Sequence, residues 1–235
     1  DHGNLVFFVM TFVDGETLGA RVRRGGPLAP GEVMRITQEV AWALGHAHAR
    51  GVVHRDVKPD NILIERGTGR ALVTDFGIAR VVQSRDPGGD MPAGTPQYMS
   101  PEQGRGDEVD GRSDLYSLGI LGYQMLTGEP PFTASSTPAM LVKHISERPV
   151  PVEQRRADIP TDLARSVMTL LEKDPGNRFP TAAALVAALD TRESPMPATR
   201  APMPGSSGAA APSRSESPPA DGRYARRTSV GGARP

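Results

Sequence analysis

The sequence predicts an α+β domain that is mainly helical, followed by a tail that does not fold. Apolar residues recur at helical spacing through most of the chain after residue 14, and only a few short segments are rich in β-formers. The 235 residues suit one large domain, or a medium-sized domain with an appendage. Composition changes sharply near Thr191, so we expect the folded part to span about residues 1–190.

Charge and cysteine content exclude several classes of function. The chain has 27 basic and 27 acidic side chains and a formal net charge of zero, so its composition does not favour a nucleic-acid binder. It contains no cysteine, which excludes disulfides, iron–sulfur clusters and cysteine nucleophiles. The apolar run Leu5–Met10 is far too short to span a bilayer, and no signal peptide is expected.

The first part of the chain combines one short strand with two helices. Leu5–Met10 is rich in β-formers and predicts a short buried strand. Thr17 to Arg24 predicts a short helix that the glycine pair 25–26 terminates. A longer helix is expected after Pro30, because apolar residues follow at helical spacing: Val33, Ile36, Val40, Leu44 and Ala47.

Two further strands and a long loop come next. The strands are expected around residues 62–65 and 71–74, and they flank the turn-like sequence Arg-Gly-Thr-Gly at 66–69. Residues 78–110 show no periodicity and contain many Gly, Pro, Asp and Ser, which predicts a long loop. Because long loops in compact domains are usually functional, this segment is expected to contribute to the site.

The rest of the folded part is helical and ends in the tail. Ser113 to Thr127 predicts a largely buried helix with one apolar face, formed by Leu115, Leu118, Leu121 and Met125. Two later helices are expected to begin at Thr161 and Thr181, each with a hydroxyl placed to cap free amide groups. Residues 191–235 are mostly Pro, Ala, Ser, Gly and Arg and cannot bury enough apolar surface, which predicts a disordered linker or tail.

The segment that carries chemistry is His-Arg-Asp-Val-Lys-Pro-Asp-Asn at residues 54–61, followed by Asp-Phe-Gly at 75–77. Phosphoryl transfer needs oxygen ligands for Mg²⁺, a cation for the transferred group, and a carboxylate that orients the attacking hydroxyl. All of these groups occur within one short span of chain, at Asp56, Lys58, Asn61 and Asp75.

These motifs resemble the protein kinase family, and closely the bacterial serine/threonine kinases. Residues 54–61 match the catalytic loop of that family, and 75–77 match its metal-binding turn. Residues 94–102 look like the substrate-docking segment with the glutamate that ends the activation loop. Residues 113–119 look like the central buried helix, and 177–179 match the late arginine of the family.

The resemblance implies a protein kinase-like fold over about residues 1–190. Residues 1–13 would be the last strand and hinge of the N-lobe, 14–190 the mainly helical C-lobe, and 191–235 the disordered tail. The glycine-rich phosphate loop and the strand lysine of the family do not occur in the chain. We therefore expect the sequence to be truncated at its N-terminus and, as given, to be poorly active.

The resemblance also implies roles for individual residues. Asp56 would be the catalytic base that orients the substrate hydroxyl, and Lys58 would contact the γ-phosphate and favour Ser/Thr substrates. Asn61 and Asp75 would hold two Mg²⁺ ions. Thr95 would brace Asp56 and Lys58.

An ATP site is implied beside these residues. Met10 would be the gatekeeper, while the carbonyl of Thr11 and the amide of Val13 would meet the adenine edge. Leu63 would form the apolar floor under the base. The expected cofactor is ATP with Mg²⁺, Mn²⁺ being an alternative metal, and its contacts would be Met10, Thr11, Val13, Lys58, Asn61, Leu63 and Asp75.

Other polar residues are interpreted as architecture. A buried carboxylate needs hydrogen-bond donors, so Asp114 and the pair Glu102–Arg178 are expected to fix geometry rather than to react. His54 is likewise interpreted as a structural residue. No specific role is expected for His46 and His48, which lie on a helix.

Three functions remain in competition. The first is an active Ser/Thr protein kinase, the second a kinase-like binding or scaffold module without catalysis, and the third a small-molecule phosphotransferase of related fold. We favour the first. Lys58 and residues 94–102 argue against the third, and a parent sequence that carries the glycine-rich loop and the strand lysine would decide against the second. Its partners would be ATP and proteins with Ser or Thr, not nucleic acid. The expected location is the cytoplasm, or the cytoplasmic side of a membrane if a tether follows Pro235.

Overall fold

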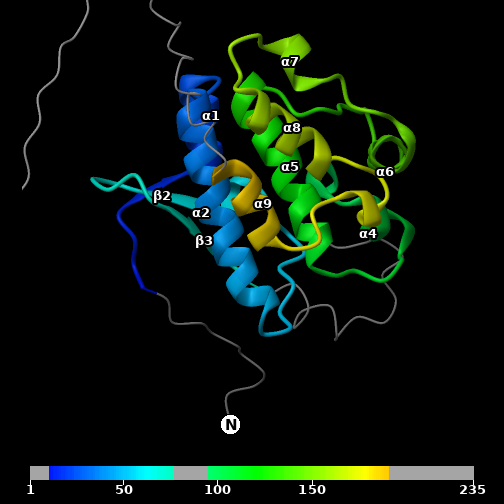
Figure 1. The fold of residues 1–235 in the computed structure, drawn as a ribbon, viewed down its shortest axis with the longest axis horizontal. Helices are drawn as coiled ribbons and strands as arrows, with labels where there is room; N and C mark the ends of the chain where they lie inside the picture. Colours follow the sequence, from blue (N-terminus) through cyan, green and yellow to red (C-terminus); the bar gives the residue numbers. More distant parts are fainter. Residues whose placement is uncertain (1–10, 77–94, 191–235) are drawn as a thin grey trace, which may run out of the picture. The chain divides into compact units, whose positions relative to one another are not determined.

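The computed structural model describes residues 11–76 and 95–190. These residues form a small sheet and a larger set of helices (Figure 1), as the α+β prediction requires. The strand expected at Leu5–Met10, residues 77–94 and the tail at 191–235 lie outside the described residues. The strands are β1 (Gly15–Thr17), β2 (Ile62–Glu65) and β3 (Ala71–Val73). The α-helices are α1 (Leu18–Gly25), α2 (Pro30–His48), α4 (Pro101–Arg105), α5 (Gly111–Thr127), α6 (Thr137–Ser146), α7 (Val152–Arg155), α8 (Thr161–Leu170) and α9 (Ala182–Asp190), and the short 3₁₀ turns are η1 (Pro59–Asn61), η2 (Pro96–Tyr98) and η3 (Pro175–Asn177).

The sheet is antiparallel and has the strand order β1-β2-β3. Ile62 pairs with Val73 in the hairpin of β2 and β3, whose turn contains two glycines with positive φ, Gly67 (89°) and Gly69 (70°). Glycine adopts this conformation without the steric cost that a Cβ would impose. The two strands expected here are thus confirmed, whereas β1, which pairs with β2, was not predicted.

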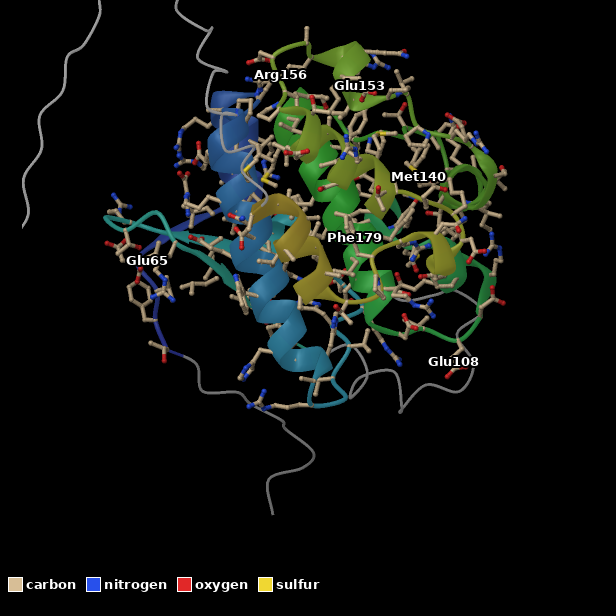
Figure 2. The ribbon with its side chains drawn as sticks, viewed as in Figure 1. Glu65, Glu108, Met140, Glu153, Arg156 and Phe179 are labelled. Carbon is tan, nitrogen blue, oxygen red and sulfur yellow. The ribbon has the colours of Figure 1, made fainter. Side chains whose placement is uncertain are left out.

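The helical core is built around α5, which packs against α2 and α8. Thirteen of its seventeen residues are buried, so the prediction of a largely buried helix is confirmed. In Figure 1, α9 lies against α2. Figure 2 labels two apolar side chains of this body, Met140 on α6, which is 4% exposed, and Phe179, which packs against the core just before α9.

Helix ends follow from local hydrogen bonds. Thr17 caps α1 by accepting a hydrogen bond from the amide of Ala20, and Gly26 ends the helix with a positive φ of 71°. Thr181 accepts from the amide of Ala184 at 3.1 Å, as expected of a cap. The same expectation was wrong for Thr161, which is the first residue of α8. The cap position there belongs to Pro160, which has no side-chain hydrogen bond to offer.

The long loop expected at 78–110 contains regular structure in its described part. After the turn η2, the helix α4 begins at a capping box, in which Ser100 and Gln103 satisfy each other's backbone amides. Propensity alone did not indicate this helix because Pro, Ser and Gly surround it. Within the described residues no helix is both long and apolar enough to cross a membrane.

Candidate active site

Three of the predicted catalytic side chains meet in the loop between α2 and β2. Lys58 Nζ lies 2.5 Å from Asp56 Oδ2, and Asn61 Nδ2 donates to the Asp56 carbonyl at 2.8 Å and to Oδ2 at 3.2 Å. Asp56 Oδ1 forms no hydrogen bond with a described residue. The carboxylate is therefore held through one oxygen, and the other is left to accept a proton or a hydrogen bond from a substrate.

The hairpin brings Asn61 and Asp75 to the same end of the sheet. Asn61 directly precedes β2, and Thr74, just after β3, donates from its amide to the Asn61 carbonyl at 2.9 Å. The Thr74 hydroxyl donates to the same carbonyl at 3.2 Å. Asp75 follows at once and its side chain is exposed. Strand pairing thus places two residues that are distant in sequence beside one another.

The backbone is in a sparsely populated conformation at two positions of this site. Among the described non-glycine residues, only Arg55 (φ 68°) and Asp75 (φ 62°) have positive φ. Such residues persist where surrounding contacts hold them, and they cluster at functional sites. The Arg55 amide donates to Asp114 Oδ1 at 2.8 Å, and its carbonyl accepts from Gln103 Nε2 at 2.8 Å. Hydrogen bonds therefore hold Arg55 at both its amide and its carbonyl, directly before Asp56.

Asp114, at the start of α5, organises the catalytic loop. Its Oδ2 accepts from the His54 amide at 2.8 Å and lies 2.7 Å from His48 Nε2, while its Oδ1 accepts from the Arg55 amide. The side chain is 1% exposed, so the prediction of a buried architectural carboxylate is confirmed. The expectation that His48 has no specific role was wrong, because that ring supplies one of the donors.

His54 joins the catalytic loop to the segment that carries Asp75. Its Nδ1 accepts from the Asp56 amide at 3.3 Å, which leaves Nε2 to donate to the Thr74 carbonyl at 2.8 Å. The ring also packs on Phe76, with ring centroids 4.8 Å apart. His54 is 1% exposed, and its contacts are those of a structural residue, as predicted.

A buried ion pair between Glu102 and Arg178 joins α4 to the segment between η3 and α9. Arg178 binds Glu102 through two parallel hydrogen bonds of 2.7 and 2.9 Å, and Ser113 Oγ donates to Glu102 at 2.5 Å. Burial by itself would raise the pKa of Glu102, but the hydrogen bonds from Arg178 and Ser113 outweigh it and hold that pKa below its ordinary value. The architectural role expected for this pair is confirmed.

The remaining predicted site residues are spread over three segments. Thr11 is exposed and Val13 half-buried in the extended chain before β1, and Leu63 is half-buried on β2, opposite Leu72. Thr95 stands at the start of η2 and forms no side-chain hydrogen bond with Asp56 or Lys58. Met10 lies outside the described residues. The roles given to these residues stay predictions.

Asn61 and Asp75 suit a magnesium-bound nucleotide. The amide nitrogen of Asn61 is engaged by Asp56, so its Oδ1, like Oδ1 of Asp75, has no partner among the described residues. One amide oxygen and one carboxylate are hard oxygen donors, and Mg²⁺ in such sites takes its other ligands from phosphates and water. The donor set therefore fits the cofactor implied by the sequence.

Gln103 is a site residue that the sequence analysis missed. Its side chain accepts from the Ser100 amide through Oε1 and donates to the Arg55 carbonyl through Nε2. The only signal in the sequence was the spacing of Ser100 and Gln103, which is that of a capping box. That spacing indicates a helix start but says nothing of Arg55, which lies 48 residues away in the chain.

A lysine-held aspartate beside two oxygen donors on a strand hairpin is the arrangement of a phosphotransferase that acts on a metal-bound nucleotide. Comparison with known proteins makes the class specific. The protein kinase domain family matches residues 1–188, and the chain belongs to that family. The predictions of a protein kinase domain and of its fold are therefore confirmed.

Named relatives agree with this assignment. The chain is 45% identical over 189 residues to the serine/threonine-protein kinase PknB of Mycobacterium leprae, covering 80% of this chain and 30% of that protein. It is 41% identical to the serine/threonine-protein kinase pkn3 of Myxococcus xanthus, covering 78% and 36%. The chain thus spans about a third of the length of these relatives.

Solved structures show the same fold. The crystal structure of the Mycobacterium tuberculosis PknI kinase domain superposes with a TM-score of 0.60 at 30% identity, covering 76% of this chain and 62% of that chain. The C20A mutant of the same domain gives a TM-score of 0.58 at 29% identity.

Proposed function

We propose that this domain transfers the γ-phosphate of ATP to serine or threonine hydroxyls of proteins. The observation that carries the proposal is the state of Asp56: Lys58 and Asn61 hold one carboxylate oxygen, and the other has no partner among the described residues. A substrate hydroxyl that donates to the free oxygen would be oriented for attack on the phosphoryl group. The serine/threonine kinases among its relatives support the same activity.

The other residues would position the nucleotide. Lys58 would lie between Asp56 and the γ-phosphate, where its charge offsets negative charge that builds up during transfer. Asn61 and Asp75 would hold Mg²⁺, which when bound neutralises the phosphates. Thr11, Val13 and Leu63 would meet the adenine, and Thr95 would support the catalytic loop. ATP and proteins with exposed Ser or Thr are the proposed partners, and the cytoplasm, where ATP is plentiful, is the proposed location.

The test uses the full-length protein that contains this chain, incubated with radiolabelled ATP, Mg²⁺ and a general protein substrate. Hydrolysis of the labelled product to amino acids should release phosphoserine and phosphothreonine. Asp56→Asn should remove the label, whereas Asp60→Asn should not, because the Asp60 side chain is 58% exposed and, among the charged groups that the structure describes, pairs only with Arg23. Label on tyrosine alone, or equal label in both variants, would contradict the proposal.

Two other functions would give different results. A scaffold module without catalysis would show no transfer in the full-length protein, although it could still bind ATP. A small-molecule phosphotransferase would label an added alcohol or amino sugar and leave proteins unlabelled. We favour the protein kinase because residues 94–102, which end in the first turn of α4, resemble a peptide-docking segment.

A further inference from the structure

A cavity of about 700 Å³ lies away from the catalytic residues, between the end of α2, the start of α5 and the first turns of α9. Its walls include Trp42 and His48 on α2, Gly111 on α5, and Ala183 and Val186 on α9. None of the residues assigned to ATP or to phosphoryl transfer lines it. Its volume is typical of sites that enclose a small molecule, which range from about 300 to 1,000 Å³.

Small residues explain why the cavity exists. At Gly45 an added Cβ would lie 3.2 Å from the Cβ of Ala182, and at Gly111 it would lie 2.6 Å from the His48 ring. The helices therefore approach closely at these points, and the alanines beside them carry too little side chain to fill the remaining space. Trp42 stands at the rim with 65% of its surface exposed, although such a large apolar ring usually gains from burial.

The Asp and Arg side chains that line the cavity pair with each other, so neither is left to bind a charged ligand. Arg112 binds Asp110 at 2.7 Å, and Asp110 also caps α5. The pKa of Asp110 is held below its ordinary value chiefly by the hydrogen bond from Arg112, so the pair stays ionised and mutually neutral. The Trp42 indole N–H forms no hydrogen bond within the described part of the chain and can donate to a carbonyl or ether oxygen.

From these observations we propose that the cavity binds an uncharged aromatic small molecule that carries a carbonyl or ether oxygen. The aromatic body would pack between Trp42 and the apolar wall of α9, and the oxygen would accept from the indole. Flat rings suit this cavity because Trp42 at its rim offers an aromatic ring on which they can pack. A charged ligand would lose its hydration without meeting an unpaired ion.

The cavity is connected to the catalytic loop through His48. That ring is part of the wall, and its Nε2 binds Asp114, which holds the amides of His54 and Arg55. An occupant that shifts His48 would therefore act on the two residues directly before Asp56. This regulatory part of the proposal rests on the proposed kinase function, whereas the binding part does not.

The binding part is tested with the uncharged naphthalene ketone prodan as the probe. Trp42 is the single tryptophan of the chain, so its fluorescence reports on this cavity alone. Prodan should quench Trp42 with a saturable 1:1 curve and receive its excitation energy. Ala183→Phe should fill the cavity mouth and weaken binding by at least about tenfold. Ala187→Phe makes the same change at an exposed position of α9 that does not line the cavity, and should bind like the parent.

Several results would overturn the proposal. Equal prodan binding by both phenylalanine variants, with circular dichroism showing both folded, would mean that the probe lies elsewhere. Stronger binding of the sulfonated probe 1-anilinonaphthalene-8-sulfonate would contradict an uncharged ligand. Self-association that Ala183→Phe abolishes would mean that this face binds a second copy of the chain.

The regulatory part is tested in the full-length kinase. Saturating prodan should change kcat in the parent and in Ala187→Phe, and should leave kcat of Ala183→Phe unchanged. Saturable binding without any effect on kcat would refute the regulatory part while the site itself stands. Absence of kinase activity in the parent would refute the proposed function, and the fluorescence result would still decide whether the cavity binds its ligand.

Discussion

Asp56 and Asp114 belong to the same part of the fold, because Asp114 accepts hydrogen bonds from the two residues directly before Asp56. Their surroundings nevertheless differ in how many carboxylate oxygens they engage. Both oxygens of Asp114 are occupied, by the amides of His54 and Arg55 and by the His48 ring, and the side chain is 1% exposed. Asp56 is 21% exposed, and one of its oxygens has no partner among the described residues.

The difference suits one aspartate to a structural role and the other to the chemical role that we propose for it. A carboxylate with both oxygens engaged and almost no access to solvent can only hold its neighbours in position. A carboxylate held through one oxygen keeps its orientation and can still accept a proton. Glu102 belongs with Asp114, since Arg178 and Ser113 engage both of its oxygens.

The largest effect on activity is expected from replacing the Asp56 carboxylate. Asp56→Asn keeps the shape of the side chain and the contact with Lys58 but removes the negative charge of the carboxylate. On the proposed function, kcat of the full-length protein should fall by about 10²–10⁴-fold. The free energy of unfolding should change by no more than about 0.5 kcal/mol, because the side chain is partly exposed. Steady-state kinetics and urea unfolding check both; a large loss of stability would place Asp56 among the structural carboxylates.

At Glu102 we expect a large loss of stability, in contrast to the small change in stability expected at Asp56. Glu102→Gln leaves the buried guanidinium of Arg178 without its counter-ion, and breaking a buried pair in this way costs about 3–5 kcal/mol of unfolding free energy. Glu108→Gln is a control, because that side chain is exposed, as Figure 2 shows at the periphery of the domain. Similar unfolding midpoints for the two variants would contradict the structural role.

The same pair makes stability depend on pH. The pKa of Glu102 is lower in the folded state than its ordinary value of 4.5, so its contribution is complete above that value and is lost as the pH falls through the folded-state pKa. The unfolding free energies of the parent and of Glu102→Gln should therefore converge as the pH is lowered below 4.5 and through the folded-state pKa of Glu102. Curves that stay parallel would show that Glu102 titrates alike in both states.

Asp114→Asn should give an intermediate effect on both properties. The new amide group cannot accept from all three donors, and leaving a buried donor unsatisfied costs about 1–3 kcal/mol. Activity should also fall, because Arg55 loses one of its two clamps next to Asp56. Asp110→Asn is a matched control, since asparagine caps a helix as well as aspartate does. Full activity of the Asp114→Asn variant would contradict this prediction, because it would show that the contacts of Asp114 do not affect Asp56.

The smallest effect is expected at Thr161 and Thr181, whose hydroxyls the sequence analysis both predicted to be helix caps. Thr181→Ala removes the cap on the amide of Ala184 and should cost about 1 kcal/mol in the free energy of unfolding. Thr161→Ala should cost no more than about 0.5 kcal/mol, because Thr161 caps nothing. Thermal unfolding of the two variants measures the difference, and equal losses would contradict the contacts that distinguish them.

Local patterns in the sequence were sufficient for much of this description. The residue types of the catalytic loop indicated phosphoryl transfer, the glycines at 66–69 indicated a hairpin turn, and apolar spacing indicated the buried helix at 113–127. Each of these depends on neighbours within a few positions along the chain, and such neighbours are visible in a sequence.

The tertiary structure alone decided which polar groups meet across the fold. His48 binds Asp114 from 66 positions away, and Gln103 binds the Arg55 carbonyl from 48 positions away. The cavity beside Trp42 likewise depends on how three helices from separate parts of the chain cross. The sequence by itself determined the chemical groups and the elements that carry them. Their partners were decided by packing, because a hydrogen bond depends on distance and direction in space, and residue order constrains neither at such separations.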